Sequence, residues 1–171
     1  MVRVFLAHPK SWQRPYINSR ILALSDLLVD KYSAYGKDKA DVRIVSGRDD
    51  HQRHFRGDWT AWQENVTTRK DAITGRVVYD FFVVSETRIG RATANILGAA
   101  LAQKRGVFLW DCTEHAKHAR GPRLSADPAP PTEKKLRRVE RIDVLDSEDW
   151  VRGFKLCCVP EQVPLFEEKS A

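Results

Sequence analysis

The chain has 171 residues, 42% of them hydrophobic, and a net charge of +6 from 29 Lys and Arg against 23 Asp and Glu. This length and composition predict a single domain spanning residues 1–171. They exclude a membrane-spanning protein, because no stretch approaches the roughly 20 apolar residues that a bilayer span needs. The apolar run before His8 is also too short for a signal peptide, so we expect a cytoplasmic protein.

The order of apolar and polar residues predicts alternating strands and helices. In chain order we expect a strand at 2–7, a helix at 17–32, a strand at 41–46, a helix at 57–73 that begins after Asp58, a strand at 77–84, a helix at 92–105, a strand at 106–111, a strand at 137–145, a short helix at 146–154 and an edge strand at 155–159. The alternation predicts an α/β fold. We expect a doubly wound, mostly parallel sheet of about five strands, Rossmann-like or flavodoxin-like.

Residues 112–135 break this pattern because they are rich in proline and lack helix or strand periodicity. They predict a mobile loop. Lys and Arg outnumber the acids between residues 114 and 141, which suits either a solvated loop or contact with phosphates. Cys112, Cys157 and Cys158 have no CxxC spacing, so the sequence suggests neither a disulfide framework nor a zinc site.

Three loops should meet at the carboxyl ends of the strands, where open α/β sheets bind their ligands. The first loop carries His8, Lys10 and Trp12, which suit a phosphate or carboxylate next to a stacked base. Two plainer interpretations remain open. Trp12 could cover the first helix, and His8 could be a hydrogen-bonded structural histidine.

The loop after the third strand leads through a glycine turn into a helix. Gly90 would let a ligand approach the backbone, and free N–H groups at the helix start favour an anion. Arg91, Thr93 and Asn95 are further candidate binding residues here. The sequence has no GxGxxG and no Walker lysine pattern, so we expect no dinucleotide and no other cofactor.

Some acidic residues stand where a carboxylate needs a partner. Asp80 falls inside an apolar stretch, so it should be buried and held by a hydrogen bond or an ion pair, in a structural or a catalytic role. Asp49 and Asp50 with His51 and His54 have a metal-like composition, but the spacing is a weak zinc signal, and we expect no metal.

The stretches "VFLAHPKSW", "DFFVVSE" and "GRATANILGAALAQKRGVFLW" resemble the nucleoside 2-deoxyribosyltransferase family and its nucleotide N-glycosidase relatives. The resemblance covers about residues 2–110. It implies a small α/β fold, usually oligomeric. It also implies cleavage of the N-glycosidic bond of a nucleoside or nucleotide through a glutamate nucleophile, with the sugar passed to another base or to water.

The sequence departs from this family at the reacting position. In ungapped register with Gly98, the family's glutamate falls on Ile96, which cannot form a glycosyl ester. Glu86 could hold a ribose hydroxyl, replace the missing nucleophile, or pair in solvent with Arg88 or Arg91. Asp71 resembles the family's base-contacting aspartate, although a solvated helix-end acid is the alternative.

Two functions therefore remain open. The first is an enzyme acting on the N-glycosidic bond, with Glu86, Asp71 and Asp80 as candidate catalytic residues. The second is a non-catalytic nucleotide-binding module on the same fold. The resemblance implies that the protein forms a homo-oligomer. Nucleic acid binding has only the basic segment in its favour, and we expect no membrane partner.

Overall fold

The structure is a computed structural model that describes residues 1–31, 42–112 and 136–160. In this part of the chain the strands are β1 Val2–Ala7, β2 Val42–Ser46, β3 Phe81–Val84, β4 Arg88–Ile89, β5 Gly106–Leu109, β6 Arg137–Val144 and β7 Phe154–Cys158, and the helices are α1 Arg14–Lys31, α2 Gly47–Phe55, α3 Trp59–Asn65 and α4 Arg91–Ala102. The strands form one sheet in the order β2-β1-β3-β5-β6-β7-β4. The α/β, Rossmann-like fold class is confirmed, although the sheet has seven strands and not about five.

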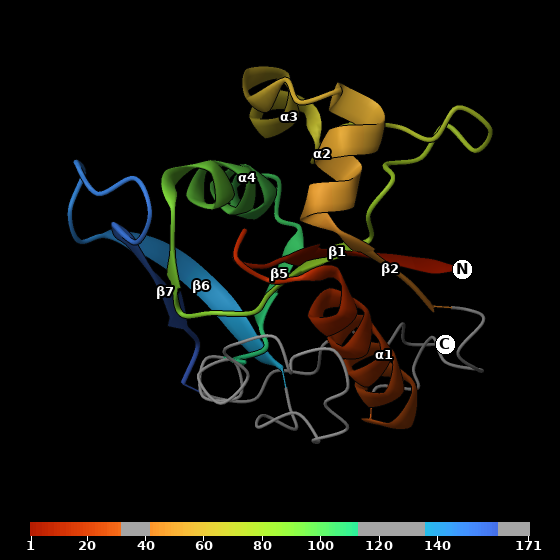
Figure 1. Cartoon of the computed structure of the whole chain (residues 1–171), viewed down its shortest axis with the longest axis horizontal. Coiled ribbons are helices and arrows are strands. Elements are labelled where there is room, and N and C mark those ends of the chain that lie inside the picture. Colours follow the sequence, from red (N-terminus) through yellow and green to blue (C-terminus); the bar gives the residue numbers. More distant parts are fainter. Residues whose placement is uncertain (32–41, 113–135, 161–171) are drawn as a thin grey trace.

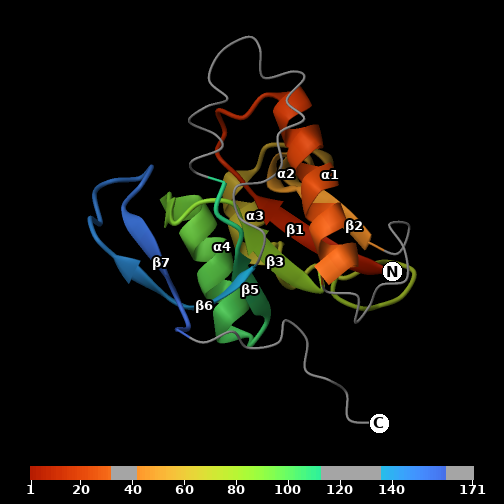
Figure 2. The same cartoon turned by 90° about the horizontal axis from the view of Figure 1, so that it is seen from below.

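Helices cover both faces of the parallel half of the sheet, which consists of β2, β1, β3 and β5 (Figures 1 and 2). On one face α1 packs Leu24 and Leu28 against the sheet residues Val4 and Phe81. On the other face lie α2, α3 and α4 (Figure 1). The chain leaves β1 toward β2 and later returns past it to β3. The carboxyl ends of β1 and β3 therefore form the switch point at which such folds bind ligands.

Antiparallel strands extend the sheet beyond β5. β6 pairs with β5, β7 pairs with β6, and the two-residue β4 pairs with the start of β7. The segment that joins β6 to β7, residues 145–153, is called the β6–β7 loop below. A short helix was expected at 146–154. Instead the two ends of the loop meet, because the N–H groups of Leu145 and Asp146 donate to the Gly153 carbonyl. These hydrogen bonds close the loop on itself and take the place of a continuous helical pattern.

The sequence pattern missed α2 entirely. Its nine residues have no apolar stripe, but Ser46 caps the helix by accepting a hydrogen bond from the Arg48 N–H, and Asp49 and Asp50 occupy the first turn. The predicted helix at 57–73 ends at Asn65 instead. Asp58 does cap it as predicted, through a bond from the Ala61 N–H.

The strand predicted at 77–84 begins only at Phe81, which corrects the expectation for Asp80. Asp80 is exposed, just before β3, and its carboxylate accepts a hydrogen bond of 2.8 Å from the Arg3 N–H. Residues before β3 instead pair locally, through a bridge between Lys70 and Val77. The expected hydrogen bond exists, but it forms at the surface.

The proline-rich loop predicted at 112–135 lies outside the described residues, except for Cys112, which is buried. Among the described residues, no helix combines the length and the apolar character that crossing a membrane requires.

Candidate functional site

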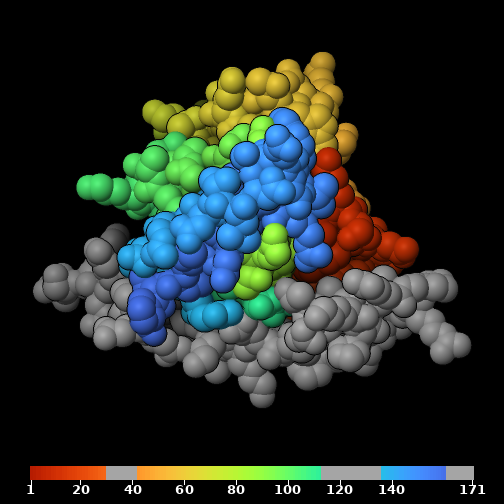
Figure 3. Space-filling model, turned by 90° about the vertical axis from the view of Figure 1, so that its left-hand side faces the viewer, coloured from red at the N-terminus to blue at the C-terminus, as the bar shows by residue number. Residues whose placement is uncertain are grey.

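Three segments of the chain end next to one another at the switch point. His8 follows β1, Ser85 and Glu86 follow β3, and Asp111 lies two residues after β5. Parallel pairing aligns these strand ends, because Ala7 is level with Val84 and Val84 is level with Leu109. Figure 3 shows the yellow-green segment after β3 at the surface, between the blue of β6 and β7 and the red of the N-terminal segment.

His8 is held as a neutral imidazole. Its Nδ1 lies 2.9 Å from the Pro9 carbonyl, which can only accept, so Nδ1 carries the hydrogen. Nε2 then accepts from the Ser46 hydroxyl at 2.5 Å, while Ser46 accepts from the Arg48 N–H. Burial lowers the pKa of His8 to about 4, against the effect of the Pro9 carbonyl and with help from the Arg48 charge. The imidazole is therefore a positioning group for the loop and not an acid at neutral pH.

The loop after β1 is tied down by its neighbours. Trp12 is buried, lies parallel to the His8 ring at 5.2 Å between centroids, and meets Tyr16 edge-on. This position agrees with the plainer interpretation of Trp12, in which its ring covers the start of α1. Lys10 is exposed, and its ammonium stands 4.0 Å from the centre of the Trp59 ring. Lys10 thus remains at the surface, whereas Trp12 belongs to the hydrophobic core.

Glu86 has a strongly shifted pKa at this edge of the sheet. Its half-buried carboxyl group has its pKa raised to about 7, first because burial disfavours the charged form. The negative charge of Asp111 also raises the pKa, and the positive charge of Arg152 opposes both effects. A carboxyl group with this pKa can both donate and accept a proton near neutral pH.

Gly90 and Arg91 have a different environment from the one predicted. The backbone that approaches Gly90 belongs to the β6–β7 loop, since a Cβ added at Gly90 would stand 2.6 Å from the Trp150 carbonyl oxygen. That same oxygen accepts a 3.0 Å hydrogen bond from the Arg91 N–H. The chain itself therefore fills the place at the start of α4 that the sequence pattern assigns to a ligand anion.

Two glycines of this region give a matched test of the packing. Gly90→Ala is expected to destabilise the protein by about 1–3 kcal/mol, because its methyl group would collide with the Trp150 backbone. Gly98→Ala, inside α4, is expected to stabilise by up to about 1 kcal/mol, because a Cβ there meets no atom within 4 Å. Thermal unfolding of both variants measures the difference. Equal shifts of the same sign would contradict this account of Gly90.

The other predicted site residues lie away from Glu86. Asp71 and Asp80 both contact Arg3, near the amino end of β1, on the opposite edge of the sheet. The Arg3 guanidinium, at 2.7 Å, is the main reason why the pKa of Asp71 falls to about 2. Asn95 points from α4 to α3, where its amide donates to Gln63 at 2.7 Å. Thr93 is half-buried in the first turn of α4.

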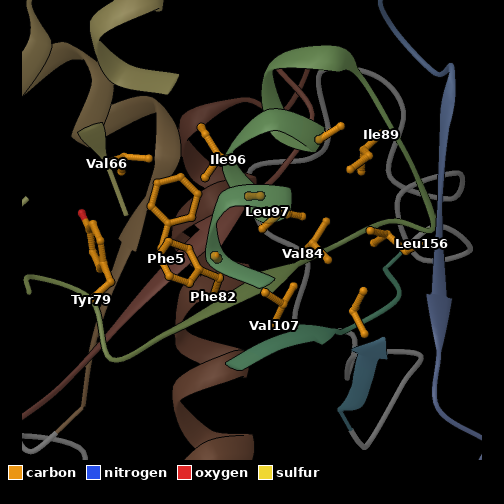
Figure 4. Close-up of a cluster of buried hydrophobic side chains, with 14 of the residues drawn as sticks. Phe5, Val66, Tyr79, Phe82, Val84, Ile89, Ile96, Leu97, Val107 and Leu156 are labelled. Atoms are coloured by element: carbon orange, nitrogen blue, oxygen red, sulfur yellow. The ribbon is translucent and has the colours of Figure 1, made fainter. Parts of the chain in front are cut away.

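Ile96, at the register position of the family's glutamate, is part of the hydrophobic core. It is 1% exposed and packs in the same cluster as Phe5 and Val66 (Figure 4). A carboxylate at this position would be buried among apolar side chains without a partner. Ile96 therefore has a packing role in this molecule.

The two aspartates of the group with metal-like composition have partners in the protein. Asp49 forms a two-pronged ion pair with Arg14, at 2.6 and 2.9 Å, and Asp50 accepts hydrogen bonds from three side chains. Within the described ranges, no three His, Cys, Asp or Glu side chains converge in a way that could hold a metal ion.

Sequence reasoning missed several residues of this edge, namely Ser46, Asp111, Trp150 and Arg152. Ser46 and Asp111 carried a usable signal, because each stands at the carboxyl end of a predicted strand. The sequence gives no signal for Trp150 and Arg152, because only the folded β6–β7 loop brings them to α4 and to Glu86.

The arrangement combines a proton-sharing carboxyl group, a neutral histidine and basic side chains at the switch point of a Rossmann-like sheet. We compared the chain with protein-family models, with curated proteins and with solved structures, and nothing in the three sets matches it.

Proposed function

We propose that the protein cleaves the N-glycosidic bond of a nucleoside or nucleotide bound at the carboxyl ends of β1 and β3. The observation that carries this proposal is Glu86, a half-buried carboxyl group at the switch point whose pKa is raised to about 7. Strongly shifted carboxyl groups in a ligand crevice are typical of acid–base catalysis. The resemblance of the strand and helix segments to nucleoside deoxyribosyltransferases supports the same chemistry.

In this proposal the protonated form of Glu86 acts as a general acid. It donates its proton to the leaving base, and the electron pair of the bond between C1′ and the base nitrogen departs with the base. Water, or the nitrogen of a second base, then adds to C1′ and gives its proton to the Glu86 carboxylate. The proton lost in the first step is thus restored, and the products are the free base and the sugar or its new nucleoside.

The experiment is an incubation of the protein with a panel of nucleosides and nucleoside mono-, di- and triphosphates, with chromatography for free base. We expect base release that Glu86→Gln abolishes, and a rate that falls as the pH rises through about 7. Glu64→Gln is the matched control, because Glu64 is exposed on α3. Release that survives in Glu86→Gln would contradict the assignment of the acid.

A second candidate function is a nucleotide-binding module without turnover. The observation that favours it is the burial of Ile96, because the family's reacting carboxylate is absent and nothing at that position could replace it. In that case the same panel would raise the thermal unfolding temperature and leave every substrate intact. The two candidates therefore separate in a single set of samples.

A further inference from the structure

The β6–β7 loop displays an aromatic side chain to solvent. Trp150 is 65% exposed and its neighbour Val151 is 73% exposed. Single exposed apolar residues are ordinary on protein surfaces, but an indole offers a large flat ring that stacks on other rings. The question is whether the ring is held in place and what lies beside it.

Hydrogen bonds fix the loop. The Asp149 carboxylate accepts from the N–H groups of Val151 and Arg152, and the Asp146 carboxylate accepts from the Glu148 N–H. Gly153 packs so tightly that an added Cβ would stand 2.1 Å from the Asp146 carbonyl oxygen. The loop is therefore ordered by its own backbone while it presents Trp150 outward.

Arg91 holds the indole from one side. Its guanidinium carbon lies 3.7 Å from the centre of the Trp150 ring, a cation–π contact. The same guanidinium donates to the Ser147 carbonyl, and the Arg91 N–H bonds to the Trp150 carbonyl. One side chain of α4 therefore orients the ring, and most of the ring surface stays accessible.

The loop that carries the ring lies beside the chain segment of Glu86. The Trp150 carbonyl caps α4, which begins five residues after Glu86. Arg152 is near enough to Glu86 to act on its carboxyl group, and its carbonyl accepts a 3.0 Å bond from Arg88. Figure 3 shows the blue surface of β6, β7 and their loop next to the yellow-green segment after β3. The β6–β7 loop therefore flanks Glu86 at the carboxyl end of β3.

We infer that Trp150, oriented by Arg91, is the surface on which the base of the ligand stacks, and that the exposed Arg88 and Arg152 take its phosphate. This inference rests on the proposed function, because it names the part of the ligand that the loop binds. A ring backed by a guanidinium suits any base, since every base has an aromatic face. The ligand is a nucleotide. The loop recognises its base by stacking on the ring face, and not by hydrogen bonds to the polar edge of the base.

The test is a calorimetric titration with adenosine 5′-monophosphate and with ribose 5-phosphate, which lacks the base. Trp150→Ala is expected to weaken binding of the nucleotide by at least about tenfold and to leave ribose 5-phosphate unchanged. Trp150→Phe should retain most of the affinity, because it keeps an aromatic face. Leu145→Ala is the matched control, since Leu145 is exposed in the same loop but has no ring.

The outcomes separate this inference from the proposed function. Base release by the wild type with unchanged nucleotide binding in Trp150→Ala would overturn the role of Trp150 and leave the enzyme standing. Trp150-dependent binding without any base release would support the role of Trp150 and overturn the enzyme. Sedimentation that shifts from dimer to monomer in Trp150→Ala, with unchanged nucleotide affinity, would assign the ring to an interface between two copies and overturn the inference.

Discussion

Asp50→Ala is expected to destabilise the folded protein by about 3 kcal/mol, because it removes a fully buried acceptor and leaves the partly buried Arg69 guanidinium without its partner. The Asp50 side chain is 0% exposed and pairs with the Arg69 guanidinium at 2.6 Å. It also accepts hydrogen bonds from the Trp62 indole at 3.1 Å and the Tyr79 hydroxyl at 2.5 Å. These bonds join α2 to α3 and to the segment before β3. Their loss therefore weakens the packing of α2 and α3 on this face of the sheet.

Asp49→Ala is the matched control for this prediction. Asp49 is the neighbouring carboxylate, and its ion pair with Arg14 is 25% and 47% exposed at the two side chains. An exposed pair of this kind is worth at most about 1 kcal/mol. Urea unfolding of the two variants measures the difference, and equal destabilisation would contradict the special role of the buried pair.

Tyr79→Phe keeps the test informative if Asp50→Ala does not fold. It removes a single donor and preserves the ring, which packs edge-on against Phe5 at 5.3 Å. We expect a loss of about 1 kcal/mol, the net value of one hydrogen bond, with somewhat more because the acceptor is charged. Burial and the Asp50 charge also raise the pKa of Tyr79, so its hydroxyl stays protonated as a donor across the accessible pH range.

The parallel half of the sheet was predictable because its strands carry the ordinary signal of burial on both faces. The strand expected at 2–7 was observed at Val2–Ala7, and the strand expected at 106–111 was observed at Gly106–Leu109. The helix predicted at 92–105 was observed at Arg91–Ala102. Each segment has a continuous apolar run or small residues at helical spacing. The switch point followed from these elements, and with it the position of Glu86.

Helix α2 could not be predicted from periodicity, because its order comes from polar contacts. Its buried residues include Asp50 and His51, which the apolar pattern treats as surface. The partners of Asp50 lie 12, 19 and 29 residues further along the chain. No local pattern reports such contacts, and only the charged first turn after Ser46 indicated a helix start.

Gly90 shows the same limit at the candidate site. A glycine at a strand-to-helix turn indicates that something approaches the backbone, but not what approaches it. Here the Trp150 carbonyl does so, from a loop about 60 residues later in the chain. The motif predicts a ligand at this place, and in the structure the loop between β6 and β7 supplies the group that approaches Gly90 and accepts from the Arg91 N–H.

The shifted pKa values of Glu86 and His8 should also be visible in the pH dependence of stability. Between pH 4.5 and about 7 the folded protein keeps on Glu86 a proton that the unfolded chain has lost, so stability falls as the pH rises through this window. Between pH 4 and 6.5 the unfolded chain holds on His8 a proton that the folded protein lacks, so this contribution rises with pH. The two contributions oppose each other where the windows overlap.

Single variants should separate these contributions. Relative to the wild type, Glu86→Gln is expected to gain stability as the pH rises from 4.5 to 7, by about 2 kcal/mol after allowance for solvent screening, and then to stay constant. His8→Gln should show the opposite slope, a relative loss between pH 4 and 6.5. Thermal unfolding at a series of pH values measures both, with expected shifts of about 4–8 °C.

Taking differences from the wild type removes the groups that titrate alike in every variant, including those outside the described residues. A difference for Glu86→Gln that stays constant from pH 4.5 to 8 would mean that the carboxyl group keeps its ordinary pKa in the folded protein. The acid of the proposed reaction would then have no physical basis. A slope of the expected sign would instead establish a group at the switch point that exchanges its proton near neutral pH, independently of any assay with substrate.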